Sequence, residues 1–146
     1  MPSRSESKCR HNWNHDGYHS AMSEPQIERR VMELVRDRMA ESPVLALQGA
    51  RSVGKSTVLK QIAFEHNTQV IDLDQLPDRA RAASEPTDTV DGPDPVCIDE
   101  YQHVPELLQA IKAQLNNRHQ NGRFVITGSS SFWSLPQGTQ ALTGRI

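Results

Sequence analysis

The sequence predicts an α/β fold in which a parallel sheet has helices on both of its faces, an α/β/α sandwich. Short apolar segments alternate along the chain with longer segments whose apolar residues recur at helical spacing. The short segments VLAL, VCI and FVI are continuously apolar, which is typical of strands covered on both faces. Because a crossover helix returns the chain to the same end of the sheet, these strands are expected to be parallel.

The chain is expected to begin with a disordered tail, residues 1–22, and to form one domain over residues 23–146. The tail is polar and contains no Leu, Ile, Val or Phe, so it cannot bury much surface. Ser-Glu-Pro-Gln at 23–26 is a capping box with a proline in the first turn, which predicts a helix that runs to about Ala40. The apolar residues at helical spacing in this helix are Ile27, Val31, Leu34 and Val35.

Four strands and two long helices are expected after this first helix. The strands are predicted at 44–48, 69–74, 95–99 and 123–127, and the helices at 56–65 and 105–117. The inward-facing residues of the two helices are predicted to be Val58, Leu59, Ile62, Leu107, Leu108, Ile111 and Leu115. Residues 75–94 are rich in Ala, Arg, Asp and Pro and are expected to hold a short helix followed by a mobile loop.

A glycine-rich segment joins the first predicted strand to the next helix. It reads GARSVGKS and fits the pattern G-x-x-x-x-G-K-[ST]. In such a P-loop the glycines permit the backbone N–H groups to surround a polyphosphate at the positive end of a helix dipole. The alternative is a turn that only links strand to helix. The predicted nucleotide-binding residues are Gly49, Ala50, Arg51, Ser52, Val53, Gly54, Lys55, Ser56 and Thr57.

Two side chains of this segment are predicted to act on the nucleotide directly. Lys55 would place its ammonium group between the β and γ phosphates, and Ser56 would give its hydroxyl to Mg²⁺. ATP and Mg²⁺ are therefore the expected cofactors.

Two acids, Asp99 and Glu100, follow the third predicted strand. Beside a P-loop, the first acid at such a strand end is expected to hold Mg²⁺. The second is expected to orient and deprotonate an attacking water. The alternative is a strand that runs out into solvent, where acids are common.

The fourth predicted strand ends in the small polar residues Thr-Gly-Ser-Ser-Ser. Ser129 is the first choice, and Thr127 the second, for a side chain that reaches the γ phosphate or positions the water. An ordinary Gly-Ser turn is the alternative.

These segments together make the chain similar to AAA-type P-loop ATPases. More narrowly, it resembles the prokaryotic group that usually carries a C-terminal domain of unknown function numbered 4143. The resemblance covers about residues 27–146. It rests on GARSVGKST, IDEYQHVPELLQAIKAQL, RFVITGSSSFWSL and ALTGRI.

The resemblance implies the roles already given for the loop and the two acids, and it adds others. Ser129 falls at the sensor position, and Gln102 matches a glutamine that couples the site to a neighbouring element. Arg145 matches an arginine that could reach a phosphate in its own or an adjacent subunit, with a surface arginine as the alternative. The catalytic residues implied are Glu100, Lys55, Ser129 and Arg145, and the metal ligands are Ser56 and Asp99.

The chain departs from this group at its end. Members of the group continue past the position of Ile146, and their sheet has the order 5-1-4-3-2. The domain is therefore expected to be incomplete, with the strand before the P-loop as an unpaired edge. A truncated reading frame or a partner that supplies the edge would explain the departure.

The function predicted is ATP binding with Mg²⁺-dependent hydrolysis by a AAA-type module. The alternative is a nucleotide-binding switch, or a fragment, without turnover. A formal net charge of −2 argues against a nucleic-acid motor without excluding one. No apolar run approaches the roughly 20 residues of a membrane span, and two cysteines without a visible signal peptide indicate a cytoplasmic protein. A homo-oligomer or an unknown protein partner is left open.

Overall fold

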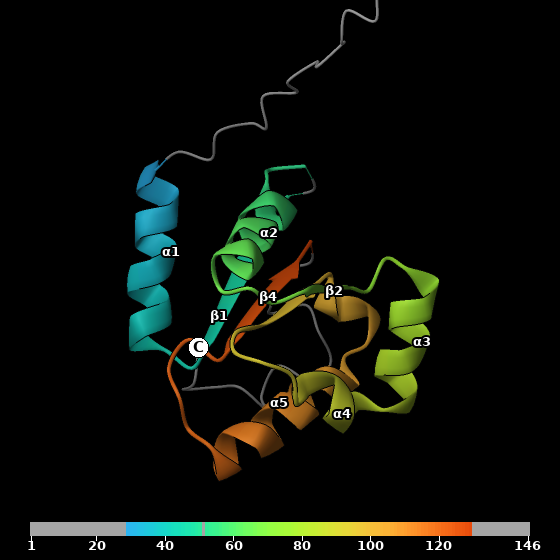
Figure 1. Ribbon diagram of the computed structural model, residues 1–146. Helices are drawn as coiled ribbons and strands as arrows, with labels where there is room; N and C mark the ends of the chain where they lie inside the picture. The colour runs from blue at the N-terminus through green and yellow to red at the C-terminus, as the bar shows by residue number, and fades with distance from the viewer. Residues whose placement is uncertain (1–28, 51, 130–146) are drawn as a thin grey trace, which may run out of the picture.

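The computed structural model describes residues 29–50 and 52–129 (Figure 1). The helices in this part are α1 (Arg29–Glu41), α2 (Lys55–Glu65), α3 (Leu76–Ser84), α4 (Pro86–Val90) and α5 (Glu106–Asn117). The strands are β1 (Val44–Gln48), β2 (Val70–Asp72), β3 (Val96–Asp99) and β4 (Phe124–Gly128). A short 3-10 helix, η1 (Tyr101–His103), follows β3. The predicted alternation of strands and helices is confirmed, although β2 is shorter than expected.

The described strands form one parallel sheet with the order β1-β4-β3-β2. Phe124 of β4 is paired with Val44 of β1 on one side and with Val96 of β3 on the other, and Ile98 of β3 is paired with Ile71 of β2. This order agrees with the 1-4-3-2 part of the order that the resemblance implies. Because the strands are parallel, the segments that follow β1 and β3 both emerge next to the end of β4.

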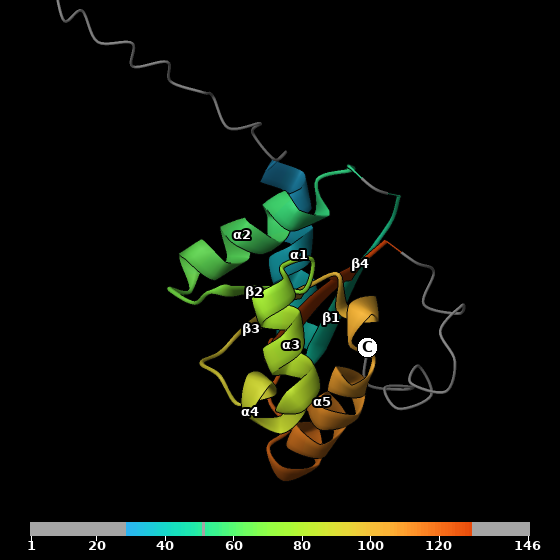
Figure 2. The same cartoon turned by 90° about the vertical axis from the view of Figure 1, so that its right-hand side faces the viewer.

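Helices cover both faces of the sheet (Figure 2). Cys97 and Val125 pack with α1 and α2, whereas Ile98 and Ile126 pack with α3, α4 and α5. Neighbouring residues of a strand point to opposite faces, so a strand covered on both faces must be apolar at successive positions. The α/β/α sandwich is therefore confirmed. All the inward-facing residues predicted for α2 and α5 are buried.

The helix predicted before the first strand is present as α1, and its buried face matches the expected apolar positions only in part, at Val35. Val31 is 41% exposed and Leu34 is 56% exposed, while Met32, Val35 and Met39 are buried. These three residues form a stripe at i, i+3 and i+7 that packs on α2 and the sheet. Two adjacent apolar stripes are available in this helix, and its neighbours in the fold decide which one is covered.

The prediction of a mobile loop within residues 75–94 is wrong in part, because a second helix, α4, follows the expected short helix α3. Pro86 occupies the first turn of α4, where its missing N–H group costs no hydrogen bond. Thr89 and Val90 are buried, and Val90 belongs to the same core cluster as the apolar face of α5. The packing of Val90 in this cluster explains why residues 86–90 form a helix.

Four predictions fall outside the described residues: the tail at 1–22, the helix start at 23–26 with Ile27, Arg51 in the P-loop and Arg145 near the end of the chain. Within the described ranges, no helix combines the length and apolar character needed to cross a bilayer.

Candidate functional site

The glycine-rich loop lies between the carboxyl end of β1 and the start of α2. Gly54 is the N-cap residue of α2 and has φ 90° and ψ 11°, a left-handed conformation that glycine adopts without steric cost. Gly54 has no side chain that could cap the helix, so the first N–H groups of α2 remain available to a ligand. Uncapped N–H groups at the positive end of a helix dipole favour an anion.

Lys55, the first residue of α2, directs its side chain back over the loop. Its Nζ atom donates hydrogen bonds to the backbone oxygen atoms of Gly49, at 2.9 Å, and Ala50, at 2.7 Å. The residue is only 9% exposed. Ser56 and Thr57 follow in the same helical turn and are half-buried. The loop therefore encloses a positive charge next to the uncapped helix end.

Asp99, the last residue of β3, is held by the neighbouring strand β4. Its Oδ1 atom accepts a hydrogen bond from the hydroxyl of Thr127, and that hydroxyl oxygen accepts one from the backbone N–H of Glu100, at 3.3 Å. Asp99 is 6% exposed and Thr127 is fully buried. A hydroxyl has a single proton, and Thr127 gives it to Asp99. Thr127 therefore orients the Asp99 carboxylate instead of donating to a ligand.

Glu100 follows β3 directly and has left-handed backbone angles, φ 55° and ψ 49°, which are uncommon for a residue with a side chain. Its Oε2 atom accepts hydrogen bonds from Nε2 of Gln102 and from the backbone N–H of Ser129, the latter at 3.3 Å. Burial raises the pKa of this carboxyl, but the hydrogen bonds from Gln102 and Ser129 and the charge of Lys55 together lower its pKa below the usual value. Glu100 is therefore ionised at neutral pH and lies within electrostatic range of Lys55.

The short helix η1 is held in place from two sides. Tyr101 is buried against Gly128, where a Cβ atom would lie 2.7 Å from Tyr101 Cε1 and 3.0 Å from Gln102 Oε1. On the other side, His103 Nε2 lies 3.0 Å from Oδ1 of Asp74, which follows β2. Sequence reasoning missed these contacts. The glycine in Thr-Gly-Ser was the available signal, because a glycine at a strand end permits a close approach.

The structure brings most of the predicted site residues to the carboxyl edge of β1, β3 and β4. The loop 49–50 and 52–57 comes from the β1 end, Asp99 and Glu100 come from the β3 end, and Ser129 comes from the β4 end. Gln102 joins the last two groups, because its amide also donates to Ser129 Oγ at 3.0 Å. Residues more than 40 positions apart therefore converge on one edge of the sheet.

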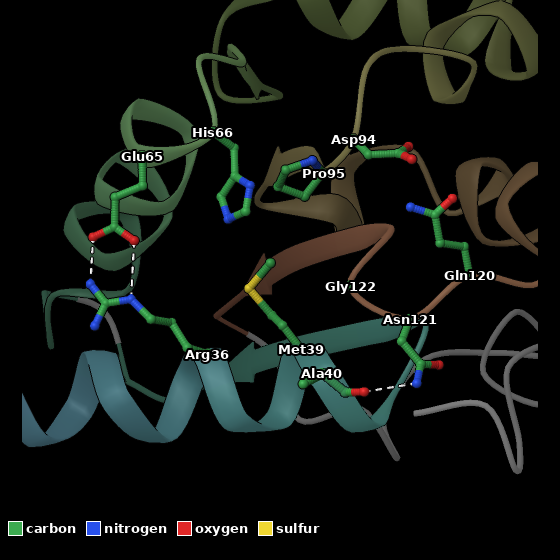
Figure 3. Close-up of a pocket in the computed structure, with 10 residues that line it drawn as sticks. All are labelled: Arg36, Met39, Ala40, Glu65, His66, Asp94, Pro95, Gln120, Asn121 and Gly122. Atoms are coloured by element: carbon green, nitrogen blue, oxygen red, sulfur yellow. Dashed lines mark hydrogen bonds and ion pairs between the residues drawn. The ribbon is translucent and has the colours of Figure 1, made fainter.

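A pocket of about 520 Å³ lies elsewhere, at the amino-terminal edge of the sheet (Figure 3). It is lined in part by the ends of α1 and α2 and by the segments that precede β3 and β4. Several of its polar groups already have partners: Arg36 forms an ion pair with Glu65, and Asn121 donates to the backbone oxygen of Ala40. This pocket is separate from the loop and the two acids.

Comparisons with known proteins agree with this geometry. The family model described as an AAA domain matches residues 41–146. An uncharacterized protein of Mycobacterium bovis and one of Mycobacterium tuberculosis are each 28% identical over 122 residues. The match covers 82% of this chain but 27% of each relative. No solved structure matches the chain. Such a domain is expected to have a P-loop at the start of a helix and an acidic strand end, both within a parallel sheet of order β1-β4-β3-β2. The chain belongs to the AAA domain family.

Proposed function

We propose that this chain binds ATP together with Mg²⁺ and hydrolyses it. The observation that carries the proposal is the position of the Lys55 ammonium over the loop, with the ionised Glu100 within range of its charge. A cation enclosed by a P-loop supports phosphate binding, and a carboxylate across the site supports the activation of water. Membership of the AAA domain family is consistent with both.

The loop would hold the phosphates through backbone groups and one side chain. The uncapped N–H groups at the start of α2 can donate to phosphate oxygen atoms. The Lys55 ammonium can exchange its bonds to the Gly49 and Ala50 carbonyls for bonds to the β and γ phosphates. This exchange keeps the buried cation hydrogen-bonded both with and without a nucleotide.

The donor set fits Mg²⁺. The Ser56 hydroxyl and the Asp99 carboxylate are oxygen ligands, which this cation prefers. Among the residues that the structure describes, no cluster of three or more His, Cys, Asp or Glu could hold a metal. Mg²⁺ usually keeps several waters and binds through one or two protein groups plus phosphates, so a sparse donor set is suitable. When bound, Mg²⁺ neutralises charge on the β and γ phosphates.

Glu100 is proposed as the general base. The water oxygen forms a bond to the γ phosphorus, and the bond from that phosphorus to the bridging oxygen of ADP breaks. The water proton passes to the Glu100 carboxylate, and ADP leaves with the bridging oxygen. The Gln102 and Ser129 hydrogen bonds to Oε2 place this carboxylate between the ends of β3 and β4.

Substitution of Lys55 tests the binding step. Lys55→Ala is expected to abolish ATP binding, measured by titration calorimetry at fixed Mg²⁺ and salt. Lys60→Ala is the matched control, since Lys60 is an exposed lysine of the same helix, and it should bind like the wild-type chain. Unchanged affinity in Lys55→Ala would show that the loop is not the binding site. Glu100→Gln should keep ATP bound and stop phosphate release.

A nucleotide-binding switch without turnover is the second candidate function. The lowered pKa of Glu100 favours it, because a more acidic carboxyl is a weaker base. Phosphate release by the purified wild-type chain separates the two candidates. A chain that binds ATP and releases none is a switch.

Further proposals rest on the resemblance. They are that Arg145 contacts a phosphate, that the chain belongs to the prokaryotic group with the domain of unknown function 4143, and that the chain associates with a second copy of itself or with another protein. The chain spans 27% of the length of each curated relative. The ATPase activity is therefore proposed for this chain, and that of a longer protein is a separate proposal.

A further inference from the structure

We propose that Gln102 is a positioning residue that holds one oxygen of the Glu100 carboxylate, so that the other oxygen takes the proton of the attacking water. This inference rests on the proposed hydrolysis. Gln102 is an uncharged residue of η1. Its proposed role is to orient the Glu100 carboxylate, which neither the loop nor Asp99 does.

The hydrogen bonds around Glu100 carry the inference. Nε2 of Gln102 donates to Oε2 of Glu100 and also to Oγ of Ser129, at 3.0 Å. The backbone N–H of Ser129 donates to the same Oε2 atom, at 3.3 Å. An amide nitrogen has two protons, so Gln102 can make both of its bonds at once. Both of these donors act on Oε2 of Glu100, and the proposal therefore assigns the reaction with water to Oε1 of the same carboxylate.

Gln102 itself has little freedom to move. The adjacent Tyr101 is 1% exposed and lies against Gly128. Oε1 of Gln102 is buried 3.0 Å from the position that a Cβ atom of Gly128 would occupy. His103 contacts Asp74 on the far side of η1. A donor fixed by its neighbours on both sides can define the direction of a carboxylate.

The orientation of the Gln102 amide also supports its role as a positioning residue. Within the described part of the chain, the buried Oε1 atom of Gln102 has no hydrogen-bond partner. Leaving a buried acceptor unpaired is unfavourable, and a hydrogen bond to an ionised group is stronger than one between neutral groups. The bond to the Glu100 carboxylate is therefore the interaction that selects this orientation of the side chain.

Loss of this donor should slow the chemical step without weakening ATP binding. A carboxylate that turns freely presents its basic oxygen in the correct direction for less of the time. Gln102→Met keeps the length of the side chain and removes its N–H groups. It is expected to lower kcat about tenfold, a modest part of what general-base catalysis contributes. The KM and Kd for ATP should stay within about twofold of the wild-type values, because the loop is unchanged.

Two comparisons separate positioning from packing. Gln109→Met alters an exposed glutamine of α5 and should leave kcat unchanged. Gln102→Ala should lower kcat at least as much as Gln102→Met. If Gln102→Met retains the wild-type kcat while Gln102→Ala loses it, the side chain acts by filling space, and the proposal is overturned.

A second measurement needs no turnover. Urea unfolding midpoints of the wild type, Gln102→Met, Glu100→Ala and the double variant form a cycle. Gln102→Met is expected to lower the midpoint clearly in the wild-type background and less in the Glu100→Ala background, because the carboxylate acceptor is absent there. If the two substitutions change the midpoint additively in the double variant, the positioning of Glu100 by Gln102 is overturned. Absence of phosphate release by the wild-type chain would instead overturn the proposed hydrolysis.

Discussion

Thr127 donates its hydroxyl proton to Oδ1 of Asp99 and thereby joins the ends of β4 and β3. The two residues are 28 positions apart, and both are buried. The same hydroxyl accepts the backbone N–H of Glu100, so a single threonine connects both acids at the strand end. The direction of the Asp99 carboxylate is therefore set by the adjacent strand.

Removal of this hydroxyl should destabilise the fold. Thr127→Val keeps the shape of the side chain and leaves the buried Asp99 carboxylate without its donor. We expect a loss of about 1–3 kcal/mol in the free energy of unfolding, measured by urea denaturation. Thr87→Val alters an exposed threonine of α4 and should change this free energy by less than about 0.5 kcal/mol. Equal losses in the two variants would contradict the role of Thr127.

Gly128 is predicted to tolerate no side chain. A Cβ atom there would lie 2.7 Å from Tyr101 Cε1, so Gly128→Ala must displace the buried ring. The expected cost is about 1–3 kcal/mol of unfolding free energy, as for other overpacked sites. At Gly92, the nearest atom to an added Cβ is 3.7 Å away, which makes Gly92→Ala the matched control. The idea fails if both variants have the same unfolding midpoint.

Cys97 is predicted to be an unreactive thiol. The side chain is fully buried, and this burial raises its pKa to about 11. In a Cys9→Ser background, a thiol reagent should label Cys97 at pH 8 only after unfolding. The unfolded thiol ionises near pH 8.5, so the folded state should lose stability as the pH rises from about 9 to 11. Rapid labelling of the native protein would contradict the burial.

The prediction from sequence succeeded where the signal is local. The continuous apolar runs predicted strands covered on both faces, and the helical spacing of Leu107, Leu108 and Ile111 predicted the buried face of α5. It failed where two adjacent sets of apolar residues in one helix could each have formed the buried face. In α1 the predicted Val35 is buried together with Met32, whereas the predicted Val31 and Leu34 are exposed. Contact with α2 and the sheet decides the rotation of the helix.

The sequence by itself determined the glycine-rich loop, the acidic strand end and the alternation of strands and helices, because each depends on residues adjacent in the chain. The tertiary structure alone decided which groups surround the acids. Thr127 meets Asp99, and Ser129 and Gln102 meet Glu100, because the parallel register places the ends of β3 and β4 side by side. Such contacts depend on strand order and register, which arise from the packing of the whole sheet between its helices.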